Sequence, residues 1–348
     1  MSNKKPEMTI DYSKAEEVFG TLYDAFENKT FPFDQVVLPQ RRDNMPDSIE
    51  WGGRDHALFL FTLCYYMRGQ IKSETAVKNL KKIWEDNKDL FDPDYLKFAD
   101  HETVSKIIED KLFFNGLGFG SKSIAPQWCL NKVKIANHWS SDPRKLFENV
   151  SGYEDALKVV ANKGKWKAEK PNGFYGFQEK MVSMLAYFYV DAGIISPLRF
   201  PPPIDFHILR VLVSNEVLKI SNFYPGMSFY YGKTTDMARE VTNWWLEKHS
   251  KDPMILSNVL WLMSRDNCER SPTNGSIIGE YKARSTKVNP KNLSFKMATK
   301  RFENTCFRCP IKDSCRYDIP SASYYTHGKL EVRQEKKKDY LVQLRLKL

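Results

Sequence analysis

The chain has 348 residues, of which 42% are hydrophobic and 14% aromatic, which is enough to bury one large core or two smaller ones. It contains no run of 18 apolar residues and no apolar signal core at its start, so we expect a cytoplasmic protein without a membrane span or structural disulfides. Residues 281–348 hold 17 Lys or Arg but only 6 Asp or Glu, so they carry the entire excess of positive charge. Such a basic segment favours a polyanionic partner, nucleic acid before an anionic membrane surface.

Apolar positions recur with helical spacing along most of the chain, and almost nothing alternates with strand period. A segment with three prolines, 31–51, reads as irregular. The fold class is therefore predicted to be all-α, without internal repeats. Helices are expected over residues 9–27, 55–68, 73–86, 102–115, 122–137, 142–150, 178–192, 205–219, 234–249 and 253–264.

Glycine-containing turns precede two of these helices. The turns, 115–122 and 172–180, end in Lys122 and Lys180, respectively. Glycines let a backbone approach a phosphate closely, and the first N–H groups of a helix point toward it. Most glycine turns between helices only reverse the chain, so both interpretations stay open.

A carboxylate is expected at the start of the 205–219 helix. Three consecutive prolines, 201–203, keep the preceding backbone out of a helix, and Asp205 is therefore predicted to be the N-cap. Most such Asp residues are only caps. An ionised carboxylate held at a fixed point is also a candidate catalyst.

Cysteines suggest a metal centre near the C-terminus. Cys64 and Cys129 lie in apolar helical stretches and are predicted to be buried thiols. The other four are Cys268, Cys306, Cys309 and Cys315, and the last three are close enough in sequence to reach one metal centre. Four thiolates suit zinc or an iron–sulfur cluster, and the spacing alone does not choose between them.

Three features resemble, in the same order along the chain, the helix-hairpin-helix DNA glycosylases of the endonuclease III type. They are the turn that ends in Lys180, the pattern Asp205-x-His207-x-x-Arg210, and the four-cysteine set. A weaker similarity extends over about residues 55 to 320. The resemblance implies two helical lobes with a substrate cleft between them. One lobe would be a helical barrel, 70–200, and the other would combine 1–69 with 201–348, including a cluster loop over 268–315.

The resemblance also implies site residues. Asp205 matches the catalytic Asp, and Lys180 matches the sugar-attacking Lys of members that also cleave the strand, with Lys122 as the alternative. The four cysteines match the ligands of a [4Fe–4S] cluster, for which zinc is the alternative. Residues expected to contact DNA are Gln70, Lys122, Gly173, Gly176, His207, Arg210, Arg308 and Lys312.

The sequence departs from the family pattern at two places. In the family a Gly-x-Gly-x-Lys pattern ends the hairpin, whereas here Gly176 is followed by Gln178 before Lys180. The family has six residues between the first two cysteines, whereas this chain has 37, which form a basic insertion. The insertion is either a surface loop or a contact for DNA or a bulky base.

The expected function is a monomeric DNA glycosylase, with or without lyase activity on abasic sites. It would flip a damaged or modified base out of double-stranded DNA, in repair or in defence against modified foreign DNA, and a bacterial member would lie at the nucleoid. One alternative is a non-catalytic iron–sulfur or zinc protein that binds nucleic acid. Another is an N-glycosidase acting on a modified nucleotide or RNA. Four aromatic residues are candidates either for the core or for stacking on the flipped base: Trp128, Tyr175, Phe177 and Phe206.

Overall fold

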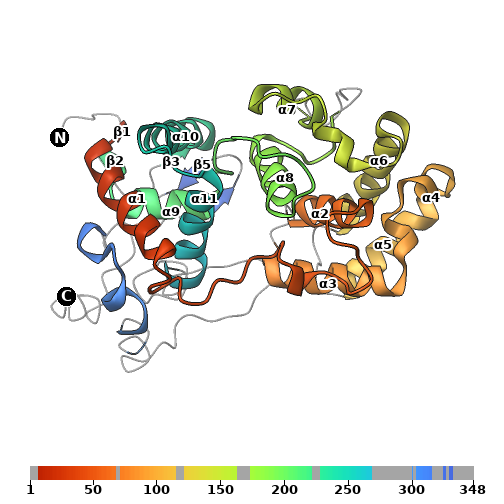
Figure 1. Ribbon diagram of the computed structural model, residues 1–348, viewed down its shortest axis with the longest axis horizontal. Coiled ribbons are helices and arrows are strands. Elements are labelled where there is room, and N and C mark those ends of the chain that lie inside the picture. The colour runs from red at the N-terminus through yellow and green to blue at the C-terminus, as the bar shows by residue number, and fades with distance from the viewer. Residues whose placement is uncertain are drawn as a thin grey trace. The chain divides into compact units, whose positions relative to one another are not determined.

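The protein is mostly helical in a computed structural model (Figure 1). The structure describes residues 7–67, 71–114, 121–162, 173–221, 228–268, 300, 303–315, 324–326 and 329–331. The chain divides into two compact units. Unit 2 is the continuous segment Val37–Pro203, and unit 1 combines Met1–Val36 with Ile204–Leu348. Among the described residues, no helix is both long and apolar enough to cross a membrane.

The boundary between the units differs from the expected one near residue 70. Residues 37–69 belong to unit 2 because helix α2 (Arg54–Met67) packs within it, against α3 (Ser73–Asp86) and α8 (Glu179–Asp191). Every residue of α2 from His56 to Tyr66 is buried. A helix that is apolar on all sides must be surrounded by partners, so it belongs at the centre of a lobe.

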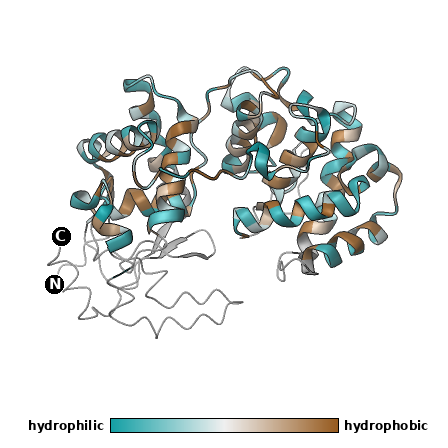
Figure 2. Cartoon of the chain, turned by 60° about the horizontal axis from the view of Figure 1, so that its bottom comes forward, coloured by the Kyte–Doolittle hydropathy of each residue, from teal (hydrophilic) through white to brown (hydrophobic). Residues whose placement is uncertain are grey.

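Unit 2 contains further helices, of which α6 also contacts α2. They are α4 (Pro93–Phe98), α5 (His101–Phe114), α6 (Ser121–Trp139) and α7 (Tyr153–Val160), with 3₁₀ turns at Arg42–Asn44, Lys88–Phe91 and Pro143–Phe147. Aromatic rings fill the space around α2: Phe61 stacks on Phe177 with ring centroids 4.9 Å apart, and Phe91 meets Trp128 at 5.1 Å. Apolar and polar residues mix along the helices of both units in Figure 2, as amphipathic packing requires.

Unit 1 packs α1 (Tyr12–Glu27) against α10 (Tyr231–Lys248) and α11 (Pro253–Leu262), with α9 (Phe206–Ser214) also against α10 and α11. A π-helical turn, Met263–Asn267, continues α11. Two small antiparallel sheets complete the described part. β1 (Glu7–Ile10) pairs with β2 (Leu218–Ser221), and β5 (Lys329–Glu331) lies between β3 (Ser228–Tyr230) and β4 (Tyr324–Thr326).

Two predicted helices differ from the structure. The helix expected over 205–219 ends at Ser214, because Asn215 caps it and Glu216 takes a left-handed conformation with φ of 57°, after which the chain continues as β2. The helix expected over 142–150 is only the 3₁₀ turn Pro143–Phe147. Helices α4 and α7 and all the short strands were missed, since segments this short carry little periodicity.

Candidate active site and cysteine loop

Asp205 is the N-cap of α9, as its sequence context predicts. Its Oδ1 accepts hydrogen bonds from the backbone N–H of His207 at 2.9 Å and of Ile208 at 3.3 Å. The side chain is buried, with 7% of the residue exposed. The two N–H donors and the positive end of the helix dipole both favour the negative form of the carboxylate. The site thus holds a carboxylate in one orientation inside unit 1.

Beneath this helix start, one buried hydroxyl joins the two other residues of the Asp-x-His-x-x-Arg pattern. Ser264, in the π-helical turn, lies with its Oγ 3.1 Å from His207 Nδ1 and 3.1 Å from Arg210 Nη1. Arg210 is only 3% exposed, and its guanidinium carbon lies 5.6 Å from the Phe206 ring centroid. Arg210 Nε has no hydrogen-bond partner among the described residues. Arg210 is therefore a buried cation of the core, whereas the sequence suggested a DNA contact.

The cysteine loop is a series of tight turns within unit 1. Two 3₁₀ turns, Cys306–Arg308 and Lys312–Ser314, place Cys309 between them. Backbone bonds close the turns: Cys309 N donates to Cys306 O at 3.1 Å, and Cys315 N donates to Lys312 O at 3.2 Å. Cys306 and Cys309 are buried, while Cys268 and Cys315 are half-buried.

The four thiols lie in one electrostatic neighbourhood. Burial raises the pKa of Cys268 to about 12; the nearby Arg210 charge acts in the opposite direction, and Cys306 adds to the rise. Burial also raises the pKa of Cys309 well above its ordinary value, and Cys268, Cys315 and Cys306 each raise it further. Thiols that oppose one another's ionisation in this way are neighbours.

The donor atoms of this loop suit a metal better than the positions of its side chains do. Four thiols are the donors that zinc and iron–sulfur clusters take, and a bound cation would offset the repulsion between thiolates. Among the described residues, however, no group of three or more His, Cys, Asp or Glu side chains is placed to hold a metal ion. The cysteine set therefore remains a candidate by chemistry and neighbourhood.

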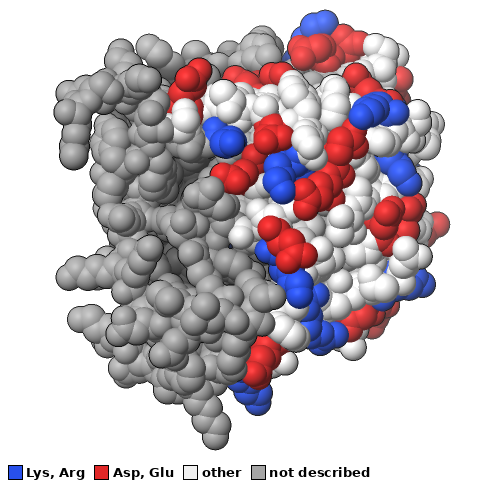
Figure 3. Space-filling view, turned by 90° about the vertical axis from the view of Figure 1, so that its left-hand side faces the viewer, with Lys and Arg blue, Asp and Glu red and all other residues white. Residues whose placement is uncertain are grey.

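The cysteine loop contacts the first segment of the chain. Ser314 Oγ donates to a carboxylate oxygen of Glu17 on α1, and the guanidinium carbon of Arg308 lies 4.3 Å from the ring centroid of Phe31. The Lys312 ammonium lies 5.2 Å from the Phe307 ring centroid. Both cations expected to meet phosphates are thus already in contact with aromatic rings. On the face in Figure 3, the described acidic and basic side chains are intermixed.

Lys180 lies in unit 2, one residue after the first residue of α8, and is half-buried. Its positive charge opposes the rise that burial causes in the pKa of the Cys64 thiol on α2. Asp205 belongs to unit 1.

The turn before α8 is held by its neighbours. Phe174 N donates to Val160 O at 3.0 Å, and Asn162 N donates to Phe177 O at 2.8 Å, so the turn is attached to the end of α7. A Cβ added to Gly173 would lie 2.7 Å from Ala161 O, which leaves room only for glycine. Gly176 has φ of 80°, a conformation that glycine adopts at little cost.

Two residues of α6 also hold this turn, and no sequence motif pointed to them. Asn131 donates from Nδ2 to Tyr175 O at 3.0 Å, and its Oδ1 accepts from Tyr175 N at 2.8 Å. The buried Lys134 ammonium donates to Gly173 O at 2.7 Å. Gly173 and Gly176 are therefore explained by packing and backbone conformation, whatever else the turn binds.

Other expected site residues give a mixed result. Gln70 and most of the insertion between the first two cysteines lie outside the described residues, as does the side chain of Lys122 at the start of α6. Trp128 and Phe177 are almost fully buried, so both belong to the core. Of the four aromatic candidates, Tyr175 and Phe206 are partly exposed.

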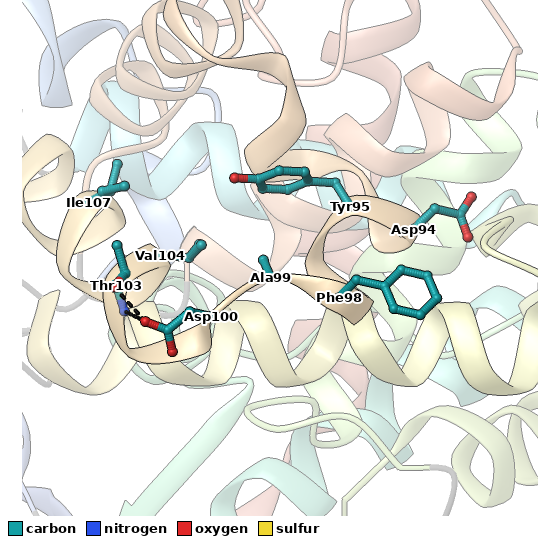
Figure 4. Close-up of a pocket in the computed structure, with 8 residues that line it drawn as sticks. All are labelled: Asp94, Tyr95, Phe98, Ala99, Asp100, Thr103, Val104 and Ile107. Carbon is teal, nitrogen blue, oxygen red and sulfur yellow. Dashed lines mark hydrogen bonds between the residues drawn. The ribbon is translucent and has the colours of Figure 1, made fainter.

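A surface groove of about 470 Å³ lies between α4 and α5 (Figure 4). Tyr95 and Phe98 form part of its apolar wall, and Asp100, between the two helices, accepts hydrogen bonds from the N–H and hydroxyl of Thr103. None of the candidate residues described above lines it. The groove therefore has no connection with the expected chemistry.

Comparison with known proteins adds no family to these observations. No protein-family model matches the chain, and no curated protein matches it significantly.

Proposed function

We propose that this protein is a DNA glycosylase of the helix-hairpin-helix type. The observation that carries the proposal is the buried carboxylate of Asp205, held by two backbone N–H groups at the start of α9. Support comes from the arrangement of unit 2, where α7, a glycine turn and α8 follow one another and Lys180 lies in the first turn of α8. The cysteine loop of unit 1 and the basic residues after 280 fit a protein that binds a polyanion.

In the proposed reaction, the bond between C1′ of the sugar and the base breaks, and the sugar gains positive charge. The Asp205 carboxylate, held in one orientation, stabilises that charge and accepts a proton from the attacking group. In a lyase, the neutral amine of Lys180 would attack C1′ and form a Schiff base. A metal centre held by Cys268, Cys306, Cys309 and Cys315 would supply a structural cross-link of the loop. The reaction itself requires only Asp205 and a nucleophile.

The proposal predicts how one substitution affects base release and how another affects trapping of the Schiff base. Oligonucleotides carrying assorted damaged and modified bases are incubated with the protein, and borohydride traps any Schiff base. Asp205→Asn keeps the cap acceptor but loses the charge, so we expect base release to fall by about 100-fold or more. Lys180→Ala abolishes trapping if Lys180 is the nucleophile. Lys158→Ala, which removes an exposed lysine of α7, is the control that should still be trapped.

Two results would contradict these assignments. Base release by Asp205→Asn at the rate of the unmodified protein would remove Asp205 from catalysis. Trapping that persists in Lys180→Ala would show that another amine attacks the sugar. DNA binding without release of any base would favour the non-catalytic alternative.

A further inference from the structure

The hydroxyl of Ser264 has two partners that differ in whether they can accept a hydrogen bond. Ser264 is fully buried, and its two hydrogen-bond contacts are with Arg210 Nη1 and His207 Nδ1. A guanidinium has only donors, so Ser264 Oγ accepts from Arg210. A serine hydroxyl has one proton to donate, and among the described residues His207 Nδ1 is the acceptor within its reach.

The hydrogen-bond pattern therefore determines the tautomer of His207. If Nδ1 accepts from Ser264, the neutral ring carries its proton on Nε2. The opposite tautomer, with a proton on Nδ1, would leave the buried Ser264 proton without an acceptor. Because an unsatisfied buried donor costs free energy, the first tautomer is preferred by roughly five- to 100-fold.

Neighbouring rings fix the plane of the His207 ring. The Phe206 ring centroid lies 3.9 Å away, and Trp261 meets His207 edge-on at 6.2 Å. The Arg265 guanidinium carbon in turn lies 4.2 Å from the Trp261 ring centroid. Ser264 itself is held in the π-helical turn after α11, and such turns occur often at functional sites. Both the orientation and the protonation of the ring are thus determined by contacts within unit 1.

We propose that Ser264 is a positioning residue that holds His207 in the Nε2–H form, beside Asp205 at the start of α9. In this form, His207 donates a hydrogen bond to an anionic oxygen of the bound strand. Because His207 acts as a hydrogen-bond donor in this form, Asp205 is the group at the start of α9 that accepts a proton. The role in binding a strand rests on the proposed function, whereas the tautomer does not.

The tautomer is measured directly in the full-length protein. With ¹⁵N-labelled histidine, the two ring nitrogens of His207 are distinguished by their chemical shifts, and His207→Gln identifies the signal. We expect Nδ1 to be the unprotonated nitrogen. In Ser264→Ala, we expect the two tautomers to become mixed. Ser257→Ala, which removes a buried serine of α11, is the matched control and should leave the His207 signal unchanged.

Strand binding is measured by fluorescence anisotropy with a duplex that contains a stable abasic-site analogue. His207→Gln keeps an N–H donor and should bind within about threefold of the unmodified protein, whereas His207→Leu should bind about tenfold more weakly. Equal losses in the two variants would overturn the donor role.

The two measurements fail independently. Protonated Nδ1 in the unmodified protein would overturn the tautomer assignment even if Ser264→Ala does not fold. Failure of the unmodified protein to bind any duplex would refute the proposed function and the donor role, while the tautomer result would stand.

Discussion

At the scale of single residues, His56 is the clearest buried group with a measurable consequence. The side chain is fully buried in α2, and Nδ1 accepts from Gly52 N at 3.0 Å, so Nε2 carries the proton of the neutral ring. Nε2 has no hydrogen-bond partner among the described residues. Burial, followed by the charge of Arg42, lowers the His56 pKa to about 4. The ring is therefore neutral in the folded protein near pH 7.

This depressed pKa predicts a pH-dependent stability. Histidine in the unfolded chain titrates near pH 6.5, so the unfolded chain binds more protons than the folded protein between pH 6.5 and about 4. The folded protein therefore loses stability as the pH is lowered through this window. The expected loss is about 3 kcal/mol in the free energy of unfolding. Urea unfolding of the unmodified protein and His56→Gln at pH 7 and pH 4.5 measures it.

The difference between the two proteins isolates His56, because all other groups titrate in both. His138→Gln, at an exposed position of α6, should behave as the unmodified protein does. If His56→Gln loses as much stability on acidification as the unmodified protein, the contribution of His56 is absent.

The same scale shows what a sequence can reveal about a site. Asp205 could be predicted as a helix cap from the prolines before it, since capping is a local property. Ser264 is 57 residues from His207 and carries no local signal. Arg210 was expected to contact DNA because it completes the family-like pattern with Asp205 and His207, but tertiary packing buries it.

At the scale of elements, the glycine turn before α8 shows how packing explains a motif. Its attachment to α7 requires the carbonyl of Ala161 to approach Gly173 closely. Asn131 and Lys134 then fix the turn from α6. The turn was predicted from its glycines alone. Glycine is required at position 173 because the backbone of Ala161 lies against it, and the sequence does not show this contact.

Substitution of this glycine tests the packing. In Gly173→Ala the new methyl group would meet backbone, which cannot move as a flexible side chain can, and we expect a loss of about 1–3 kcal/mol in the free energy of unfolding. Gly20→Ala is the matched control: it lies inside α1 with open space around its Cβ position, and we expect a gain of about 0.5–1 kcal/mol. Denaturant titration measures both. Equal stability of Gly173→Ala and the unmodified protein would contradict the close approach.

At the scale of the whole molecule, the two units differ in how the chain forms them. Unit 2 is one continuous segment with its own aromatic core around α2. Unit 1 instead combines α1, which precedes unit 2 in the sequence, with α9 to α11, which follow it. Helical content could be predicted from periodicity. The boundary could not, because the assignment of α2 depends on which helices surround it.

This difference predicts the behaviour of two fragments. A fragment of residues 37–203 contains all the helices of unit 2, so we expect it to be helical and to unfold cooperatively on heating. A fragment of residues 204–348 lacks α1, which buries Phe19 and Leu22, and we expect no cooperative transition. Circular dichroism measures both. A cooperative transition of the second fragment would show that α1 is dispensable for its core.

The discontinuity of unit 1 has a consequence for synthesis on the ribosome. Helix α1 leaves the ribosome before residues 37–203, while its partners α10 and α11 follow them. Unit 2 can close its core during that interval, but the apolar side of α1 has no complete partner until α10 and α11 have been synthesised. The apolar side of α1 therefore stays uncovered while residues 37–203 are synthesised, and slowing translation after residue 203 would lengthen that exposure.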